Sequence, residues 1–211
     1  MRSPDEFIGE LWGYANEVPM IEHPWFAGIL QHRWTHEQIR SLQAAEDIDR
    51  MLATVLFADI VDSTGRAASM GDRAWKKLLE QHQRVVHGEI DRWHGQNVEF
   101  TGDGVMAVFD APTRALRCAF ELVEAARGLD VETRVGIHTG EIERRETGVG
   151  GIAVHIAARL LGHAEKGQVV VTKTVRDLVT GTDLAFRPLG AASLRGVPGE
   201  WELFEARTSE R

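Results

Sequence analysis

The chain has 211 residues, 43% of them hydrophobic, which suits one compact domain with a smaller appendage. Its 24 Lys and Arg residues against 32 Asp and Glu residues give a formal charge of -8, so it lacks the positive field that favours binding to nucleic acid or an anionic membrane. A single cysteine, Cys118, excludes an internal disulfide framework. No apolar stretch is long enough to span a bilayer and the start shows no export signal, so we expect a cytoplasmic protein.

Residues 1–50 are predicted to form a helical N-terminal arm. They mix tryptophans with polar residues and lack the alternation that is typical of a strand. Within them, Thr35-His-Glu-Gln38 resembles a capping box, in which the Thr35 hydroxyl accepts hydrogen bonds from the first unpaired N–H groups of a helix. A helix is therefore expected from there toward Asp49.

Residues 51–211 are predicted to form one domain in which strands and helices alternate. An apolar strand ends at Asp59 and leads into a long helical pattern, which Gly71-Asp72 is expected to divide in two. Two strands follow, over 98–101 and 105–109, and the dipeptide Gly102-Asp103 between them suits a tight hairpin.

The second half of the domain continues this alternation. Its predicted elements are a helix over 112–127, a strand over 134–140, a helix after Gly148-Val-Gly-Gly151, a strand over 168–171, a helix over 174–179, and strands over 186–189 and 201–206. One pair of strands is joined directly as a hairpin, whereas helices connect the others. We therefore expect an α+β fold, a ferredoxin-like mixed sheet covered by helices.

Asp59 and Asp103 are the most informative residues for function. Each places an anionic oxygen at the end of a strand-like segment, where a hard cation can reach it. Taken singly, Asp59 fits a helix-capping or turn aspartate and Asp103 an ordinary hairpin residue. As a pair, they indicate a divalent-metal site that handles a nucleotide triphosphate.

Three segments give the chain a resemblance to a known family. Phe57-Ala-Asp-Ile-Val-Asp-Ser-Thr64, Phe100-Thr-Gly-Asp-Gly-Val-Met-Ala107 and Val154-His-Ile-Ala-Ala-Arg159 resemble, in this order, the motifs of class III nucleotidyl cyclases. The resemblance covers about residues 51–206. It implies a catalytic domain that converts ATP or GTP to a 3′,5′-cyclic nucleotide and pyrophosphate, a reaction of intracellular signal transduction.

The resemblance also implies how the triphosphate is held. Asp59 and Asp103, helped by the carbonyl of Ile60, would bind two Mg²⁺ or Mn²⁺ ions per site. Ser63 and Thr64 lie where the turn enters a helix N-terminus, whose N–H groups suit the β and γ phosphates.

Three further residues of the family's pattern fall in the second half of the domain. Arg159 fits the transition-state arginine, whose guanidinium holds oxygens of the α-phosphate; the alternative is a surface arginine in a salt bridge. His155 occupies the place of an asparagine that orients the ribose, and it presents a different shape. Arg195 fits a phosphate-binding cation, or alternatively a solvated turn residue.

The base-reading positions depart from the adenylyl type. Glu99 stands where adenylyl cyclases of the family generally have lysine, and it matches the guanylyl type because a carboxylate accepts hydrogen bonds from the guanine N1–H and amino groups. Gly148 falls at the second base-reading position and offers no side chain. With His155, these changes leave an alternative open, a cyclase-like module that binds nucleotide or a partner without turnover. Hydrolysis on the same metal pair is a third reading, but the motifs place no general base for water.

The resemblance implies an assembly as well. The family builds its sites between two catalytic domains, with the aspartates from one and the arginine from the other. This chain holds both sets in a single domain, so we expect a two-fold homodimer with two shared sites.

Overall fold

The computed structural model describes residues 50–145 and 148–209. Apart from residue 50, the predicted N-terminal arm lies outside the described residues. The elements in chain order are β1 (Arg50–Ile60), α4 (Ser63–Met70), α5 (Asp72–Arg92), β2 (Gln96–Thr101), β3 (Gly104–Phe109), α6 (Pro112–Arg127), β4 (Thr133–Arg145), β5 (Gly148–Gly150), α7 (Ile152–Leu160), the 3-10 turn η2 (Leu161–His163), β6 (Val169–Thr172), α8 (Lys173–Leu178), β7 (Leu184–Ser193) and β8 (Glu200–Thr208).

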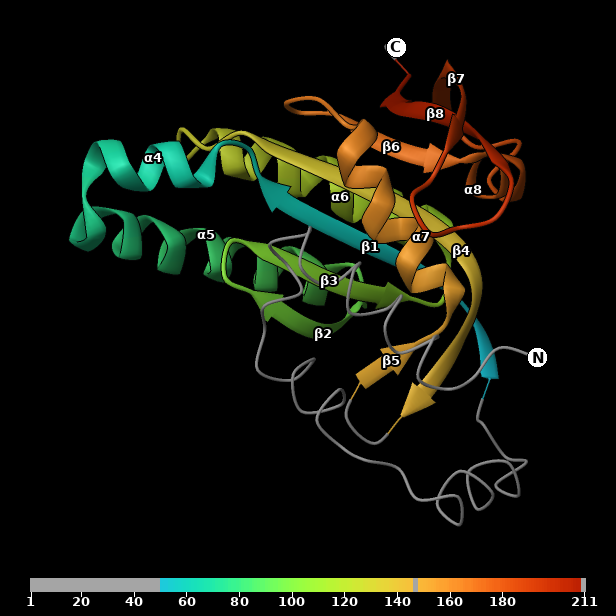
Figure 1. Ribbon diagram of the computed structural model, residues 1–211, viewed down its shortest axis with the longest axis horizontal. Helices are drawn as coiled ribbons and strands as arrows, with labels where there is room; N and C mark the ends of the chain where they lie inside the picture. The colour runs from blue at the N-terminus through green and yellow to red at the C-terminus, as the bar shows by residue number, and fades with distance from the viewer. Residues whose placement is uncertain (1–49, 146–147, 210–211) are drawn as a thin grey trace. The chain divides into compact units, whose positions relative to one another are not determined.

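The strands form one mixed sheet in the order β2-β3-β1-β4-β6-β8-β7, with β5 paired to β4 (Figure 1). β4 and β6 run parallel, whereas β1 lies antiparallel between β3 and β4. Helices cover the sheet, so the predicted α+β fold with a ferredoxin-like mixed sheet is confirmed.

Most predicted elements are found close to their expected ranges. α6 spans 112–127 as predicted, and Gly71, at a φ of 79°, separates α4 from α5. The strand expected over 134–140 is longer, because the residues after Gly140 pair with the start of β1 and with β5. β5 itself was not predicted, since the glycine run reads as a loop, although it pairs with the end of β4 just before it in the chain.

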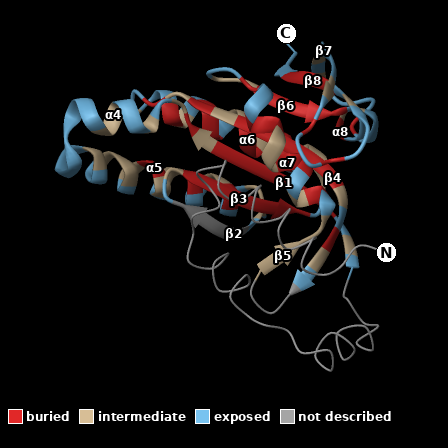
Figure 2. Cartoon of the chain, viewed as in Figure 1, coloured by how far each residue is buried: buried red, intermediate tan, exposed pale blue. Residues whose placement is uncertain are grey.

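The two faces of the sheet have different partners (Figure 1). One face packs against α5, α6 and α8 in the main core, through side chains such as Ile90, Leu116 and Val175. On the other face, Ile156 and Leu160 of α7 pack in a separate cluster with sheet residues that include Val170 and Leu203. Figure 2 shows the central strands as mainly buried, while α4 is mainly exposed.

Strand alternation assigns each residue of β1 to a face. Leu56 and Ala58 belong to the main core beneath α5 and α6. Side chains two residues apart share a face, so Asp59 lies with Val55 and Phe57 on the opposite face, the one that carries α7. The end of β1 therefore presents its carboxylate away from the main core.

α7 lies close against β4 at Gly136. A Cβ added to Gly136 would be 2.7 Å from the main-chain oxygen of Ala157 and 2.8 Å from Cβ of Leu160. Only a glycine at this position permits so close an approach. Gly136 thus allows α7, the helix that carries His155 and Arg159, to pack directly against β4.

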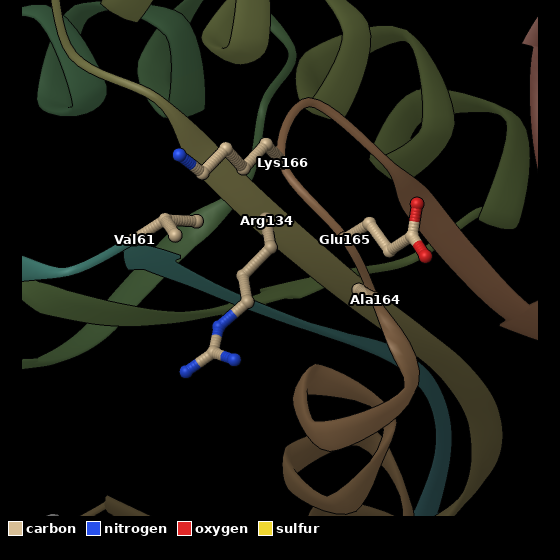
Figure 3. Close-up of a pocket in the computed structure, with 5 residues that line it drawn as sticks. All are labelled: Val61, Arg134, Ala164, Glu165 and Lys166. Atoms are coloured by element: carbon tan, nitrogen blue, oxygen red, sulfur yellow. The ribbon is translucent and has the colours of Figure 1, made fainter.

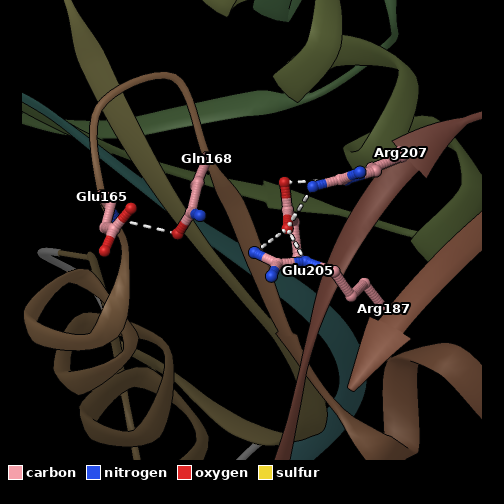
Figure 4. Close-up of polar contacts among 5 residues, drawn as sticks. All are labelled: Glu165, Gln168, Arg187, Glu205 and Arg207. Atoms are coloured by element: carbon pink, nitrogen blue, oxygen red, sulfur yellow. Dashed lines mark hydrogen bonds and ion pairs between the residues drawn. The ribbon is translucent and has the colours of Figure 1, made fainter. Parts of the chain in front are cut away.

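A charged cluster joins β7 to β8 at the far side of the sheet (Figure 4). Arg187 and Arg207 both bind the carboxylate of Glu205, with the Arg187 Nε to Glu205 Oε2 bond at 2.6 Å. Burial alone would raise the pKa of Glu205, but the hydrogen bonds from the two arginines outweigh it and the pKa lies below its ordinary value. The two guanidinium groups thus offset the charge of the carboxylate, and the Arg187–Glu205 contact links β7 to β8.

In the part of the chain that the structure describes, no helix has the length and apolar character needed to cross a bilayer.

We expect Gly136→Ala to lower the free energy of unfolding by about 1–3 kcal/mol, because α7 must shift away from β4 to admit the methyl group. Urea denaturation measures the effect. Gly88→Ala is the matched control, since a Cβ at this helical position meets no atom within 4 Å. It should stabilise the protein by about 0.5–1 kcal/mol through helix propensity. Equal effects of the two substitutions would contradict the close contact at Gly136.

Candidate active site

The sheet brings Asp59 and Asp103 together. β1 and β3 pair antiparallel up to Ala58 and Val105, so the end of β1 lies beside the hairpin tip that carries Asp103. A side-chain hydrogen bond and the negative charge of Asp103 both act on the Asp59 carboxyl. The predicted convergence of these two carboxylates is therefore present within one chain.

The pKa of the Asp59 carboxyl is raised above its ordinary value. Burial is the main cause that raises its pKa, and the charge of Asp103 raises it further. The hydrogen bond and charge of Arg134 lower it, yet the pKa remains above the ordinary value of 3.8. A divalent cation between the two carboxylates would supply further positive charge.

The donor set suits a cation that takes ligands from its substrate as well. Within residues 50–145 and 148–209, no group of three or more His, Cys, Asp or Glu side chains could hold a metal ion. Two carboxylates and the main-chain carbonyl of Ile60 would leave further positions to water and phosphate oxygens. This is the way Mg²⁺ commonly binds in nucleotide sites.

Arg134 is a site residue that the sequence analysis missed. Its Nη2 lies 2.9 Å from Asp59 Oδ2, and the two residues are Cα partners in the pairing of β1 with β4. This contact follows from the register in which β1 pairs with β4, and the order of the motifs along the chain does not reveal that register.

A pocket of about 390 Å³ lies beside this ion pair (Figure 3). Arg134 and Lys166 line it with Val61, the first residue after β1, and with Ala164 and Glu165. In Figure 3 the Glu165 carboxylate is directed away from the Arg134 guanidinium. The main-chain N–H of Glu165 donates to Gln168 Oε1 at 2.9 Å, which fixes the turn that carries Lys166 (Figure 4). Two cations therefore border a hollow next to the aspartates.

Ser63 and Thr64 lie in the first turn of α4, directly after β1. The N-cap residue Asp62 has left-handed backbone angles, with φ 56° and ψ 39°, and makes no side-chain cap hydrogen bond. The first N–H groups of α4 are thus not capped by that side chain, and a helix N-terminus in this state favours an anion.

α7 carries the second predicted set. His155 is exposed, and Arg159 is partly exposed one turn later. Arg159 Nε donates to the main-chain oxygen of Arg195 at 3.1 Å, so the structure brings these two predicted residues together. Among the described ion pairs, the partner of Asp59 is Arg134, and none joins Arg159 to Asp59 or Asp103. Asp59 and Arg159 thus have different partners within one chain.

The two predicted base-reading positions, Glu99 and Gly148, lie on β2 and β5. Glu99 is in β2 with its backbone opposite Met106, after a register shift that follows Asn97. Its side chain lies outside what the structure describes. Gly148 begins β5 at a φ of 114°, which residues with side chains rarely adopt. The backbone conformation at this position therefore favours glycine over residues that have a side chain.

A buried histidine lies on the sheet face that carries α7. His138 is 5% exposed, its Nδ1 is 2.8 Å from Thr172 Oγ1, and its ring meets Trp201 edge to face at 5.5 Å between centroids. Burial lowers its pKa to about 4. The folded chain therefore holds this imidazole neutral beside the helix that carries Arg159.

Comparison with known proteins agrees with these features. Residues 45–205 match the family model of the adenylate and guanylate cyclase catalytic domain. An uncharacterized protein of Mycobacterium tuberculosis is 36% identical over 153 residues, which cover 70% of this chain and 53% of that protein. Another from this organism is 29% identical, and the match covers 41% of its length. The chain thus spans about half or less of these curated relatives.

Solved structures show the same fold. The adenylyl cyclase CyaB from P. aeruginosa superposes with a TM-score of 0.71 at 21% identity, covering 77% of this chain and 97% of that one. An adenylate/guanylate cyclase/hydrolase from Silicibacter pomeroyi superposes with a TM-score of 0.64 at 27% identity, covering 75% and 97%.

The buried His138 predicts a loss of stability in acid. Its pKa in the folded state, about 4, lies below the ordinary 6.5, so the unfolded chain binds the proton more readily between these values. The free energy of unfolding should fall as pH drops from about 6.5 to about 4, by on the order of 3 kcal/mol for this group. His138→Asn, which keeps a polar atom near Nδ1, should show a shallower pH dependence in urea denaturation. His82 contributes in the same direction, so part of the dependence should remain. Parallel curves for the two proteins would contradict the assignment.

Proposed function

Since the chain belongs to the adenylate and guanylate cyclase catalytic domain family, we propose that it converts ATP or GTP to a 3′,5′-cyclic nucleotide and pyrophosphate at sites shared by two copies in a homodimer. The observation that carries this proposal is the convergence of Asp59 and Asp103 at the ends of β1 and of the β2–β3 hairpin, where burial and the charge of Asp103 raise the pKa of Asp59.

The metal site is assigned to Asp59, Asp103 and the carbonyl of Ile60. These groups would hold two Mg²⁺ or Mn²⁺ ions, which would lower the pKa of the ribose 3′-hydroxyl and neutralise charge on the triphosphate. Arg134 holds Asp59 in the chain as it stands. When Asp59 binds a cation, the Arg134 guanidinium can turn to the phosphates in the adjoining pocket that Lys166 also lines.

The chain's own groups orient the triphosphate. The β and γ phosphates meet the N–H groups at the start of α4, around Ser63 and Thr64. The 3′-oxygen then forms a bond to the α-phosphorus while the bond from that phosphorus to the β-phosphate oxygen breaks. Pyrophosphate leaves with its electron pair, and the hydroxyl proton passes to water. Arg159 of the partner subunit holds oxygens of the α-phosphate as charge shifts toward the leaving group.

Two groups support Arg159. Its Nε bond to the Arg195 carbonyl fixes the direction of the guanidinium, and Arg195 adds a second cation for phosphate. His155, one turn earlier on the same helix, can give the ribose one hydrogen bond.

Selection of the base is expected to be weak. Glu99 can accept hydrogen bonds from guanine, but Gly148 gives the opposite side of the base no polar partner. Discrimination of about 10⁴-fold needs buried polar groups that the wrong base leaves unpaired.

The competing proposal is a module that binds nucleotide or a partner without turnover. It is favoured by Gly148 and His155, and by the ion pair that Arg134 forms with a metal aspartate. The two proposals differ in whether any cyclic product forms.

We expect the purified protein to form cyclic nucleotide from ATP or GTP with Mg²⁺ or Mn²⁺, and Asp59→Asn and Asp103→Asn to lower the rate by more than about 100-fold. Mass spectrometry identifies the product in each mixture. Asp110→Asn is the control, because this exposed aspartate pairs with Arg114 outside the site. If no condition gives a cyclic product, the binding module is the better reading.

Mixing inactive variants tests the shared sites. Asp59→Asn and Arg159→Ala homodimers should each be nearly inactive, with a loss of about 10²–10³ for the arginine. Random exchange makes half of the dimers mixed, each with one intact site of two, so activity should return to about a quarter of the native rate. A mixture of Asp59→Asn and Asp103→Asn should recover no activity, because both substitutions remove an aspartate from the same side of the shared site. Failure of the first mixture to recover, once exchange is verified, refutes the shared site.

A further inference from the structure

α5 carries a histidine within an apolar stripe. His82, Val86 and Ile90 are four residues apart, so they share the face of the helix that packs on the sheet. Val86 and Ile90 are completely buried, and His82 is 3% exposed. His82 therefore places a polar ring at a position where the apolar periodicity of α5 predicts an apolar side chain.

The His82 ring is not satisfied by the residues around it. Its Nε2 is buried and has no hydrogen-bond partner within the described part of the chain. Burial lowers the pKa of His82 to about 4, so the ring is neutral and desolvated at pH 7. A buried polar atom without a partner destabilises the fold, and its presence requires an explanation other than packing.

The explanation lies at the hairpin tip next to α5. The negative charge of Asp103 acts on the His82 ring and raises its pKa, against the larger effect of burial. The next residue on the helix, Gln83, donates from Nε2 to the main-chain oxygen of Gly102 at 3.0 Å. Two consecutive residues of α5 thus interact with the same two-residue turn, one with its backbone and one with the charge of its carboxylate.

The pairing of the strands does not itself fix the position of Asp103. Asp59 extends from a paired strand and is held by Arg134, whereas Asp103 stands in the turn between β2 and β3, beyond their last paired residues Thr101 and Gly104. Metal-binding carboxylates are generally fixed by hydrogen bonds from an outer set of residues.

We propose that His82 and Gln83 are positioning residues for Asp103: Gln83 anchors the Gly102 carbonyl, and His82 Nε2 hydrogen-bonds the Asp103 carboxylate when that carboxylate holds a cation. This inference rests on the proposed function in one respect, that Asp103 is a metal ligand.

The test measures binding of Mn²⁺ alone, so that it does not depend on turnover. In His82→Leu, which keeps an apolar volume but removes Nε2, we expect the Kd for Mn²⁺ to rise about 10–100-fold, as followed by the electron paramagnetic resonance signal of free Mn²⁺. The Tm without metal should rise, because an unpaired buried polar atom is removed. The increase in Tm that Mn²⁺ causes should be lost.

Two further variants separate the roles. His82→Gln retains a donor on a side chain of similar length and should recover part of the Mn²⁺ affinity. Gln83→Met removes the donor to Gly102 with little change in shape and should weaken Mn²⁺ binding as well. His87→Leu, an exposed histidine on the same helix, is the control and should leave Mn²⁺ affinity unchanged.

The Mn²⁺ measurements distinguish a failure of this inference from a failure of the proposed metal site. An unchanged Kd in both His82→Leu and Gln83→Met, while the native protein binds Mn²⁺, overturns this inference and leaves the metal site intact. No Mn²⁺ binding by the native protein refutes the metal premise of the proposed function, and this inference with it. Weakened binding with a raised Tm supports the positioning role whether or not cyclic product is formed.

Discussion

Two carboxylates held close together in a partly buried place are the constraint around which this domain is organised. Burial raises the pKa of Asp59, and the like charge of Asp103 raises it further, because like charges at short range in low dielectric repel. The fold tolerates the arrangement because Arg134 stands opposite Asp59 in the strand pairing and donates to it. A single arginine balances one of the two charges. The remaining negative charge is what would favour a cation in the proposed metal site.

The division of the sheet into two faces explains how such a site can exist in a stable domain. Leu56, Ala58, Val105 and Ala107 give the face beneath α5 and α6 a continuous apolar core. That core fixes β1 and β3, and the alternation of β1 then points Asp59 to the other face. Asp103 stands at the border, where the hairpin tip can be approached from both sides. This position accounts for its contact with Asp59 and for the approach of α5.

The sequence predicted the fold well where signals are local. The limits of α6 follow from a proline at its first position and from its apolar periodicity, and Gly71 marks the break between α4 and α5. β5 and the extension of β4 were missed, because a strand of three residues rich in glycine has no pattern of its own and depends on its partner. The same reason hid Arg134, whose role follows from lying opposite Asp59 rather than from any motif.

The candidate site shows a related limit. The motif order was enough to nominate Asp59, Asp103 and Arg159, but it could not show which of them meet within a chain. In the structure the two aspartates converge beside Arg134, while Arg159 is fixed to the carbonyl of Arg195.

That separation is itself an argument about assembly. An arginine that paired with the aspartates within its own chain, as Arg134 does with Asp59, would have to leave that pair before it could bind a phosphate. In the proposed dimer, Arg159, whose Nε donates to the main-chain oxygen of Arg195, would offer the rest of its guanidinium to a phosphate bound by the other copy. For the proposed shared sites, a two-fold axis would be the simplest way to bring the aspartates of one copy to the arginine of another, because the same operation that completes one site completes the second.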